Sequence, residues 1–244
     1  MTTNQPRRLA DTLAEWEAEQ RAEWEKAGTA LTFDAWKQEQ RAKEAAEAEA
    51  RIAAEERAAA SRRVRTQFER QVPHRYLGAS TDQAELLTWS ATLAGAVLDR
   101  GYLRGPSILL VGRTGVGKTH AAYGALSRYI DAGGHCRPTV VTAADLYAQL
   151  RPRPGRDSEE LFEQHARANL LFVDDLGAAK SSEWVEEINY RLINARYNNN
   201  LPTLITSNVP PTELGAILGD RVASRLTEMC TTVVLKGHDR RRAA

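Results

Sequence analysis

Eight consecutive residues near the middle of the chain have the types and spacing of a loop that holds phosphate groups. They are Gly112, Arg113, Thr114, Gly115, Val116, Gly117, Lys118 and Thr119. In such a loop the backbone N–H groups converge on the α- and β-phosphates of a nucleotide, and glycine permits the tight turn. Lys118 would bring its charge to the β- and γ-phosphates, and the Thr119 hydroxyl would bind Mg2+. The pattern predicts a nucleotide site, to which we also assign the next residue, His120; an ordinary glycine-rich turn is the alternative.

Two aspartates follow a second apolar run. Residues 169–173 read Asn-Leu-Leu-Phe-Val, and Asp174 and Asp175 come directly after them. A buried parallel strand delivers such residues to the edge where α/β sheets bind ligands. There Asp174 would hold Mg2+ through its water shell, and Asp175 would orient or deprotonate the attacking water. Either aspartate alone could be a loop cap, but the pair, with a phosphate loop upstream, predicts a catalytic site.

Polar residues further along the chain complete the candidate catalytic set. Asn208 follows the apolar run 202–207, where its amide can accept a hydrogen bond from water and donate one to a phosphate oxygen. By itself Asn208 would be a turn residue. Arg221 and Arg225 lie four residues apart on one face of an expected helix. A structural salt bridge to Asp220 or Glu228 is the alternative role for these two arginines.

Strands and helices have to alternate along the chain to bring these residues to one edge of a sheet. Apolar and β-branched runs predict strands over 107–111, 139–142, 169–173, 202–207 and 231–235. Apolar residues at helical spacing predict helices over 82–99, 118–131, 183–198 and 219–228. This alternation predicts an α/β fold with a parallel sheet covered on both faces.

The first 70 residues differ in composition from the rest, and we divide the chain into a helical arm, 1–70, and a globular domain, 71–244. Ala, Glu, Arg and Gln dominate the arm, which predicts helix, with a break at Gly28 and a new start at Thr32. Its aromatic residues are Trp16, Trp24, Phe33 and Trp36. Aromatic anchors on an amphipathic helix commonly fill a partner's groove. We therefore interpret the arm as a docking region; a solvated helical spacer is the alternative.

The overall composition argues against several other classes of protein. The chain has 244 residues and a formal net charge of +1, so nucleic-acid binding would need a local basic patch. Its two cysteines and five histidines show no metal-ligand spacing. No segment approaches the roughly 18 apolar residues of a membrane span, and the start of the chain lacks the pattern of a signal peptide. These observations predict a cytoplasmic protein without membrane contact.

A loop after the second expected strand and its helix carries three arginines within six residues. Arg151, Arg153 and Arg156 stand there among two prolines and a glycine. Loops on α/β scaffolds are common places for ligand contact, so these arginines are candidates for binding a DNA phosphate backbone. A solvated charged loop is the alternative.

Five segments together resemble the DnaC/IstB branch of the AAA+ ATPases. They are residues 72–75, 112–119, 170–177, 206–208 and 219–226, and the resemblance covers about residues 70–244. It implies a five-stranded parallel sheet of order 5-1-4-3-2, with protomers associated side by side and ATP at their interface. It also implies that residues 112–119 are Walker A, Asp174 and Asp175 Walker B, and Asn208 sensor 1. Arg225 would be an arginine finger that reaches a neighbour's γ-phosphate, assisted by Arg221.

The chain departs from this family pattern in two places. Many AAA+ proteins have glutamate where this chain has Asp175, whose side chain is one methylene shorter, so slow hydrolysis is expected. The C-terminal helical lid has no room after the last strand and is expected to be absent or vestigial. The segment from Gly237 to Arg241 matches the family's sensor 2 segment only loosely. We assign Arg241 to that role, with a plain basic tail as the alternative.

The resemblance favours a Mg2+-dependent ATPase that loads a hexameric replicative helicase. The arm would dock on the helicase while the ATPase domain assembles and contacts single-stranded DNA. An IstB-like transposition ATPase, which would bind duplex DNA and a transposase, is the rival within the same family. A P-loop kinase acting on a small molecule is a second alternative, and a non-hydrolysing adaptor that uses ATP as an assembly switch is a third.

Overall fold

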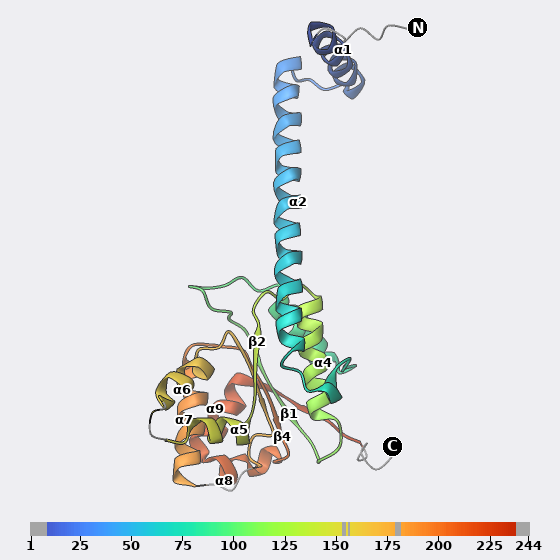
Figure 1. The fold of residues 1–244 in the computed structure, drawn as a ribbon. Helices are drawn as coiled ribbons and strands as arrows, with labels where there is room; N and C mark the ends of the chain where they lie inside the picture. Colours follow the sequence, from blue (N-terminus) through green and yellow to red (C-terminus); the bar gives the residue numbers. More distant parts are fainter. Residues whose placement is uncertain (1–8, 153–154, 156, 179–181, 238–244) are drawn as a thin grey trace, which may run out of the picture. The chain divides into compact units, whose positions relative to one another are not determined.

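The computed structural model describes residues 9–152, 155, 157–178 and 182–237 (Figure 1). The chain divides into two compact units, residues 1–56 and 57–244. None of the helices in the described ranges is long and apolar enough to cross a lipid bilayer.

The first unit contains helix α1 (Leu9–Ala27) and the beginning of helix α2 (Phe33–Glu69). Thr32 starts α2 as expected, because its hydroxyl accepts a hydrogen bond from the N–H of Ala35 at 3.4 Å. The rings of Trp24 and Phe33 meet edge to face at 5.8 Å, and Phe33 stacks on Trp36 at 6.3 Å. Three of the four aromatic residues of the arm therefore join α1 to α2. Trp16 is the one left largely accessible, with 44% of its surface exposed.

The second unit is built on a five-stranded sheet in which all pairings are parallel. Its strands are β1 (Ser107–Val111), β2 (Pro138–Thr142), β3 (Leu170–Asp174), β4 (Thr203–Ser207) and β5 (Cys230–Val234). Their spatial order is β2-β3-β4-β1-β5, which confirms the predicted order 5-1-4-3-2. The carboxyl ends of β1, β3 and β4 consequently lie next to one another at one edge of the sheet.

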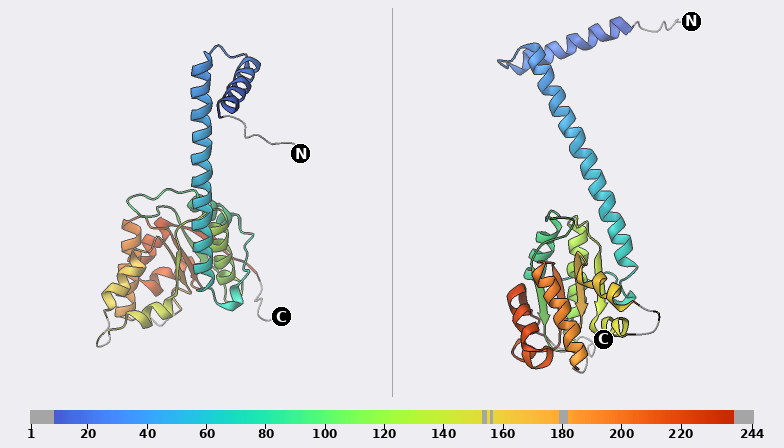
Figure 2. Two further views of the ribbon diagram at one scale, coloured as in Figure 1. Left: turned by 45° about the horizontal axis from the view of Figure 1, so that its top comes forward. Right: turned by 90° about the vertical axis from the view of Figure 1, so that its left-hand side faces the viewer.

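Helices cover both faces of the sheet (Figures 1 and 2). Helices α3 (Ala84–Ala94) and α4 (Lys118–Asp131) pack on one face, together with the end of α2. The other face is covered by α5 (Ala143–Leu150), α6 (Ser158–Ala166), α7 (Glu183–Asn198), α8 (Leu214–Leu218) and α9 (Asp220–Met229). Within β1, Ile108 and Leu110 point to the first layer and Leu109 and Val111 to the second, as the two-residue period of a strand requires.

The end of α2 belongs to the core of the second unit. Val64 and Phe68 are 7% and 1% exposed and lie in the same hydrophobic cluster as α3 and α4. The guanidinium of Arg65 donates to the backbone carbonyl of Ser127 at 3.4 Å and forms an ion pair with Asp131 on α4. Contacts thus place the boundary between the units near residue 56; the functional division at residue 70 stays a prediction.

Three helices differ from the expectation. The helix predicted over 82–99 ends at Ala94, because the chain turns after Gly95 and forms a tight bridge between Asp99 and Tyr102. Val97 is accordingly 86% exposed. Helices α6 and α8 have no counterpart among the predicted elements. The start of α6 is capped by Asp157, whose carboxylate accepts from two backbone N–H groups at 2.9 and 3.1 Å.

Replacing Phe68 with alanine tests whether the end of α2 is part of the core. The Phe68 ring lies 6.3 Å from that of Tyr123 on α4 and is almost fully buried, so Phe68→Ala is expected to lower the free energy of unfolding by about 3–5 kcal/mol. Urea denaturation followed by tryptophan fluorescence measures this change. The neighbouring Gln67→Ala, on the exposed side of the helix, should change it by less than about 0.5 kcal/mol. Equal effects of the two variants would contradict this packing.

Candidate nucleotide-binding site

The loop between β1 and α4 has a backbone that requires glycine. Gly117, which precedes the first residue of α4, has a φ of 100°, a conformation that other residues rarely adopt. A Cβ atom at Gly112 would lie 2.5 Å from the carbonyl oxygen of Leu235, so only glycine fits there. The loop therefore wraps closely around the start of α4, where helical N–H groups and the helix dipole favour an anion.

Lys118 is buried at the base of this loop, with 6% of its surface exposed. Its Nζ donates to the carbonyl oxygens of Gly112 at 2.9 Å and Arg113 at 3.1 Å, and to Oδ1 of Asn208 at 2.5 Å. The ammonium group is thus held between the phosphate loop and the end of β4. The structure brings together Lys118 and Asn208, which the sequence separates by 90 residues.

The Asp174 carboxylate accepts two hydroxyl hydrogen bonds. Thr119 Oγ1 lies 3.0 Å and Thr206 Oγ1 2.6 Å from the same oxygen, Oδ1. Burial raises the pKa of Asp174 above its usual range, while the bonds from Thr206 and Thr119 lower it in part. A hydroxyl and a carboxylate are the hard oxygen ligands that Mg2+ prefers, so this pair fits the predicted magnesium site.

Asp175 adopts a strained backbone conformation, with a φ of 61°. Its N–H donates to Thr206 Oγ1 at 2.8 Å, and its carboxylate accepts a hydrogen bond from the amide nitrogen of Asn208. The hydroxyl of Thr206 therefore contacts both aspartates, one through the carboxylate and the other through the backbone. Backbone strain in a non-glycine residue is common at functional sites.

These residues surround a pocket of ≈ 400 Å³. Its predicted lining residues are Thr114, Gly115, Gly117, Lys118, Thr119, His120, Asp174, Asp175 and Asn208. Three other residues assigned to the nucleotide site do not line it: Gly112 and Arg113 supply carbonyl groups to Lys118, and Val116 packs into the core. His120 also accepts a hydrogen bond from the N–H of Ser80 at 3.3 Å, which gives it a structural role beside the pocket.

Sequence reasoning assigned no site role to three residues that the structure places here. Arg75 and Tyr76, in the short helix η1 (His74–Tyr76), line the pocket. The Tyr76 ring stacks on Tyr123 of α4 with centroids 4.9 Å apart. Thr206 is the third. A basic and an aromatic residue at the start of the globular domain is the signal that points to the first two, but the role of Thr206 depends on strand register alone.

Arg221 and Arg225 do not line this pocket; they lie on α9 against α7. The Arg225 guanidinium lies 5.1 Å from the ring centre of Tyr190 and 5.7 Å from that of Tyr197, and its Nε donates to Asn194 Oδ1 at 2.9 Å. Arg221 lies 5.8 Å from the Tyr190 ring. In the described part of the chain neither arginine forms an ion pair with Asp220 or Glu228, so the salt-bridge alternative is not observed.

Three other predicted contact residues, Arg153, Arg156 and Arg241, lie outside the described residues. Arg151, which follows α5, is exposed and lies 5.8 Å from the ring centre of Trp184. The proposed contact of the Arg151 loop with DNA therefore stays a prediction.

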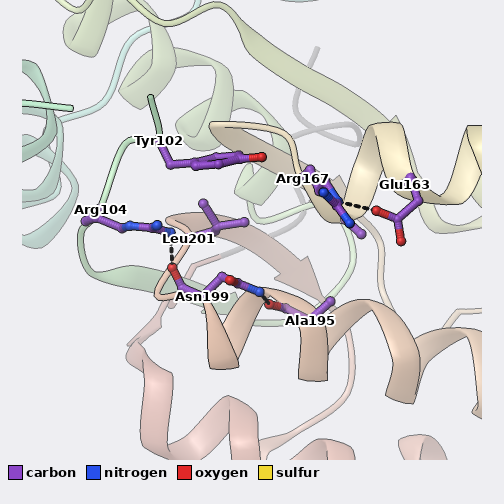
Figure 3. Close-up of a pocket in the computed structure, with 8 residues that line it drawn as sticks. Tyr102, Arg104, Glu163, Arg167, Ala195, Asn199 and Leu201 are labelled. Carbon is purple, nitrogen blue, oxygen red and sulfur yellow. Dashed lines mark hydrogen bonds and ion pairs between the residues drawn. The ribbon is translucent and has the colours of Figure 1, made fainter. Parts of the chain in front are cut away.

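A second hollow, of ≈ 300 Å³, lies at the opposite edge of the sheet, where β1, β3 and β4 begin (Figure 3). Two arginines line it and are already paired: Arg104 with the carbonyl of Asn199, and Arg167 with Glu163 (Figure 3). Ligands of open α/β sheets bind at the carboxyl ends of the strands. We therefore place the functional site at the phosphate loop and not in this hollow.

A phosphate loop after β1, carboxylates at the end of β3 and an amide at the end of β4 define a P-loop nucleotide-binding domain of the AAA+ class. The sequence profile of one family, described as IstB-like ATP binding protein, matches residues 102–243. The chain belongs to this ATP-binding family.

Individual relatives agree with this assignment. The chain is 24% identical to the replicative helicase loader DnaC of Escherichia coli (strain K12), over 49% of each chain. It is 29% identical to an ATP-binding protein of insertion sequence IS21 from Pseudomonas aeruginosa, over 57% of this chain and 53% of that protein. A crystal structure of the DnaC helicase loader aligns with a TM-score of 0.57 and 28% identity, covering 67% of this chain and all of the other. The chain thus spans about half the length of the curated relatives it matches.

Removing the negative charge of Asp174 should stabilise the protein when no metal is bound. Because the pKa of Asp174 is raised in the folded state, its carboxyl ionises more readily in the unfolded chain. The free energy of unfolding therefore falls as the pH rises from the pKa of the unfolded chain to that of the folded protein. Asp174→Asn keeps an Oδ1 that can accept from Thr119 and Thr206. At pH 7 without metal, Asp174→Asn is expected to unfold at a higher urea midpoint than wild type. The difference between the two midpoints should shrink in acid.

The exposed Asp82→Asn is the control and should leave the midpoint unchanged at both pH values. With Mg2+ and ATP added, Asp174→Asn should gain less stability than wild type. A metal-free midpoint below that of wild type at pH 7 would contradict the unfavourable burial of this carboxylate.

Proposed function

We propose that this protein is a Mg2+-dependent ATPase whose slow turnover depends on assembly, and that it acts in DNA replication as a loader of a replicative helicase. The observation that carries the ATPase proposal is the continuous set of contacts from Lys118 through Asn208 to Asp175, beside the pair Thr119 and Asp174. These groups are the ones that phosphoryl transfer to water requires at one place.

In this proposal ATP lies with its phosphates on the loop 112–117 and the start of α4. Lys118 would exchange its bonds to the loop carbonyls for bonds to the β- and γ-phosphates. Thr119 and Asp174 would hold Mg2+, which when bound neutralises phosphate charge. Arg75 and Tyr76, which also line the pocket, are candidates for contact with the rest of the nucleotide.

Asp175 and Asn208 would position the attacking water. The amide nitrogen of Asn208 already holds the Asp175 carboxylate, and its oxygen contacts Lys118, so the carboxylate is fixed close to the place of the γ-phosphate. Asp175 can accept the proton of that water as general base. Its short side chain supports a slow reaction.

Arg225 is proposed to complete the site of a neighbouring protomer. Arg225 lies on α9, outside the pocket of its own chain, and is held by Tyr190, Tyr197 and Asn194. A guanidinium that arrives from a neighbour neutralises charge on the transferred phosphoryl group and couples hydrolysis to self-association.

The choice of helicase loader rests on the DnaC relatives, and the partners are a hexameric helicase through the N-terminal arm and single-stranded DNA. Trp16 is the aromatic residue of the arm available for docking. A location in the cytoplasm is part of the same proposal. The IS21 relative favours a second candidate function, an ATPase that assists transposition. A small-molecule kinase finds no support among the relatives described above.

Replacing Asp175 with asparagine separates hydrolysis from ATP binding. The variant keeps an oxygen for Asn208 but loses the base, so turnover should fall by about 100-fold or more while ATP affinity changes by less than about threefold. Phosphate release and equilibrium ATP binding measure the two effects, with Asp82→Asn as control. If wild type has no turnover that this change can remove, the protein is instead an ATP-dependent adaptor.

Mixing two inactive variants tests whether sites are shared. Lys118→Ala should lose ATP binding and Arg225→Ala should bind ATP without turnover. In an equal mixture, about one interface in four pairs an intact loop with an intact arginine, so roughly a quarter of wild-type turnover should return. If the mixture regains no turnover, and Arg225→Ala alone is active, each site is complete within one subunit.

A further inference from the structure

The charge of helix α2 changes sign along its length. Residues 33–56 contain seven acidic and four basic side chains. Residues 57–75, which belong to the second unit, contain six arginines and a single glutamate. The net charge of the whole chain, +1, conceals this local excess.

Three of these arginines lie on one side of this segment, two in α2 and one directly after it. At 100° per residue, Arg62 and Arg63 fall on the side of α2 opposite to Val64 and Phe68. Arg70, the first residue after the helix, lines the same hollow as these two arginines. The burial agrees: Val64 and Phe68 are buried in the core, while all three arginines are exposed. We call Arg62, Arg63 and Arg70 the α2 basic face.

The charges of the α2 basic face have no partners within the described residues. Arg65, on another side of the helix, is paired with Glu69 and Asp131, and Glu69 is the sole carboxylate of this segment. In the described structure no ion pair involves Arg62, Arg63 or Arg70. They surround a shallow hollow of ≈ 420 Å³ whose other lining residues are Ala59, Thr66 and Gln67. The lining thus contains three uncharged residues beside the arginines and no acidic group.

Helix energetics alone does not account for this arrangement. Basic residues are stabilised by the helix dipole only within about the last turn, and Arg62 and Arg63 lie well before the end of α2 at Glu69. Solubility does not require it either, because the first part of the same helix is solvated by side chains of both signs. An anionic partner would supply the opposite charge that these arginines lack within the described residues.

We propose that the α2 basic face binds the phosphate backbone of a DNA strand. This inference rests on the proposed function, for which it names a nucleic-acid contact surface separate from the Arg151 loop. Arg62, in α2, and Arg70, directly after it, are eight residues apart, which at the helical rise is about 12 Å. This span allows contact with more than one phosphate. The small and polar residues between them offer no apolar surface for a membrane or an amphipathic peptide.

The position of this face also connects it to the nucleotide pocket. The segment that carries it continues directly into η1, where Arg75 and Tyr76 line that pocket. Phe68 and Tyr76 both contact the ring of Tyr123 on α4. DNA on the α2 basic face and ATP on the phosphate loop would therefore be held by the two ends of one short segment.

The test is the salt dependence of DNA binding by Arg62→Ala/Arg63→Ala/Arg70→Ala in the full-length protein. Fluorescence anisotropy with a labelled single-stranded oligonucleotide, and with a duplex, gives the slope of log K against log salt. Loss of three phosphate contacts should reduce the single-strand slope by about 2 and weaken binding on the order of 100-fold at about 0.1 M salt. Alanine is a better helix former than arginine, so α2 should remain folded.

Two matched variants control for net charge and for side-chain shape. Arg41→Ala/Lys43→Ala/Arg51→Ala removes three positive charges from the acidic part of the same helix and should change affinity by less than about threefold. Arg62→Lys/Arg63→Lys/Arg70→Lys keeps the charges and should keep the slope. ATP binding, measured for every variant, should equal that of wild type.

A wild-type slope in the alanine variant, or an equal loss in the Arg41/Lys43/Arg51 variant, would overturn the α2 basic face as a binding surface. If the Arg62/Arg63/Arg70 alanine variant loses affinity for the duplex alone, the result would support the α2 basic face as a DNA-binding surface and favour the transposition candidate over the loader. If the wild-type protein binds neither oligonucleotide at low salt, the proposed DNA contact itself is overturned. This failure is distinct from a failure of the ATPase proposal, because the hydrolysis experiments do not use DNA.

Discussion

The site depends on a carboxylate that the fold places where water is scarce. Asp174 ends β3, a strand whose preceding four residues are buried, and burial raises its pKa. In the protein alone this charge is held by two hydroxyls from different elements, Thr119 at the start of α4 and Thr206 in β4. Both reach it because β3 pairs with β4, and β4 with β1. The register that packs the core therefore also assembles the group that would bind a cation.

The same register explains how a strained residue is maintained next to it. An αL conformation in a residue such as Asp175 costs on the order of 1 kcal/mol or more. The bond from its N–H to Thr206 offsets part of this cost, and the next residue is held as well: Leu176 N–H donates to the Thr206 carbonyl at 2.8 Å, and Ser207 Oγ donates to the Leu176 carbonyl at 2.6 Å. These hydrogen bonds join the turn after β3 to the end of β4, and they fix the direction of the Asp175 side chain toward Asn208.

The sequence was sufficient for features that depend on local pattern and insufficient for those that depend on register or loops. The strand and helix after Ser107 and the glycines before Lys118 are local patterns, and the structure agrees with them. The pairing of Asn208 with Lys118 could be anticipated because both follow buried parallel strands. The double contact of Thr206 could not, since shifting β4 by one residue would turn its side chain to the other face. Val97 and Leu98 continue the apolar spacing and so predict a helix up to residue 99, yet α3 ends earlier, before Gly95 and the tight turn that follows.

Arginine shows most clearly why partners, not residue type, decide a role. Arg196 is fully buried, and burial lowers its pKa to about 9; it donates to backbone carbonyls before β3 and β4 and to Thr203, so it is a structural clamp. Arg65 is an anchor because Asp131 and the Ser127 carbonyl hold it. Arg225 lies against two tyrosines and an asparagine, contacts that orient a guanidinium without neutralising it. Among the residues that the structure describes, no ion pair involves Arg62, Arg63 or Arg70. Charges that the fold leaves unneutralised are available to an anion from outside the chain. For this reason we assign Arg225 to the phosphates of a neighbour's ATP, and Arg62, Arg63 and Arg70 to the phosphates of DNA.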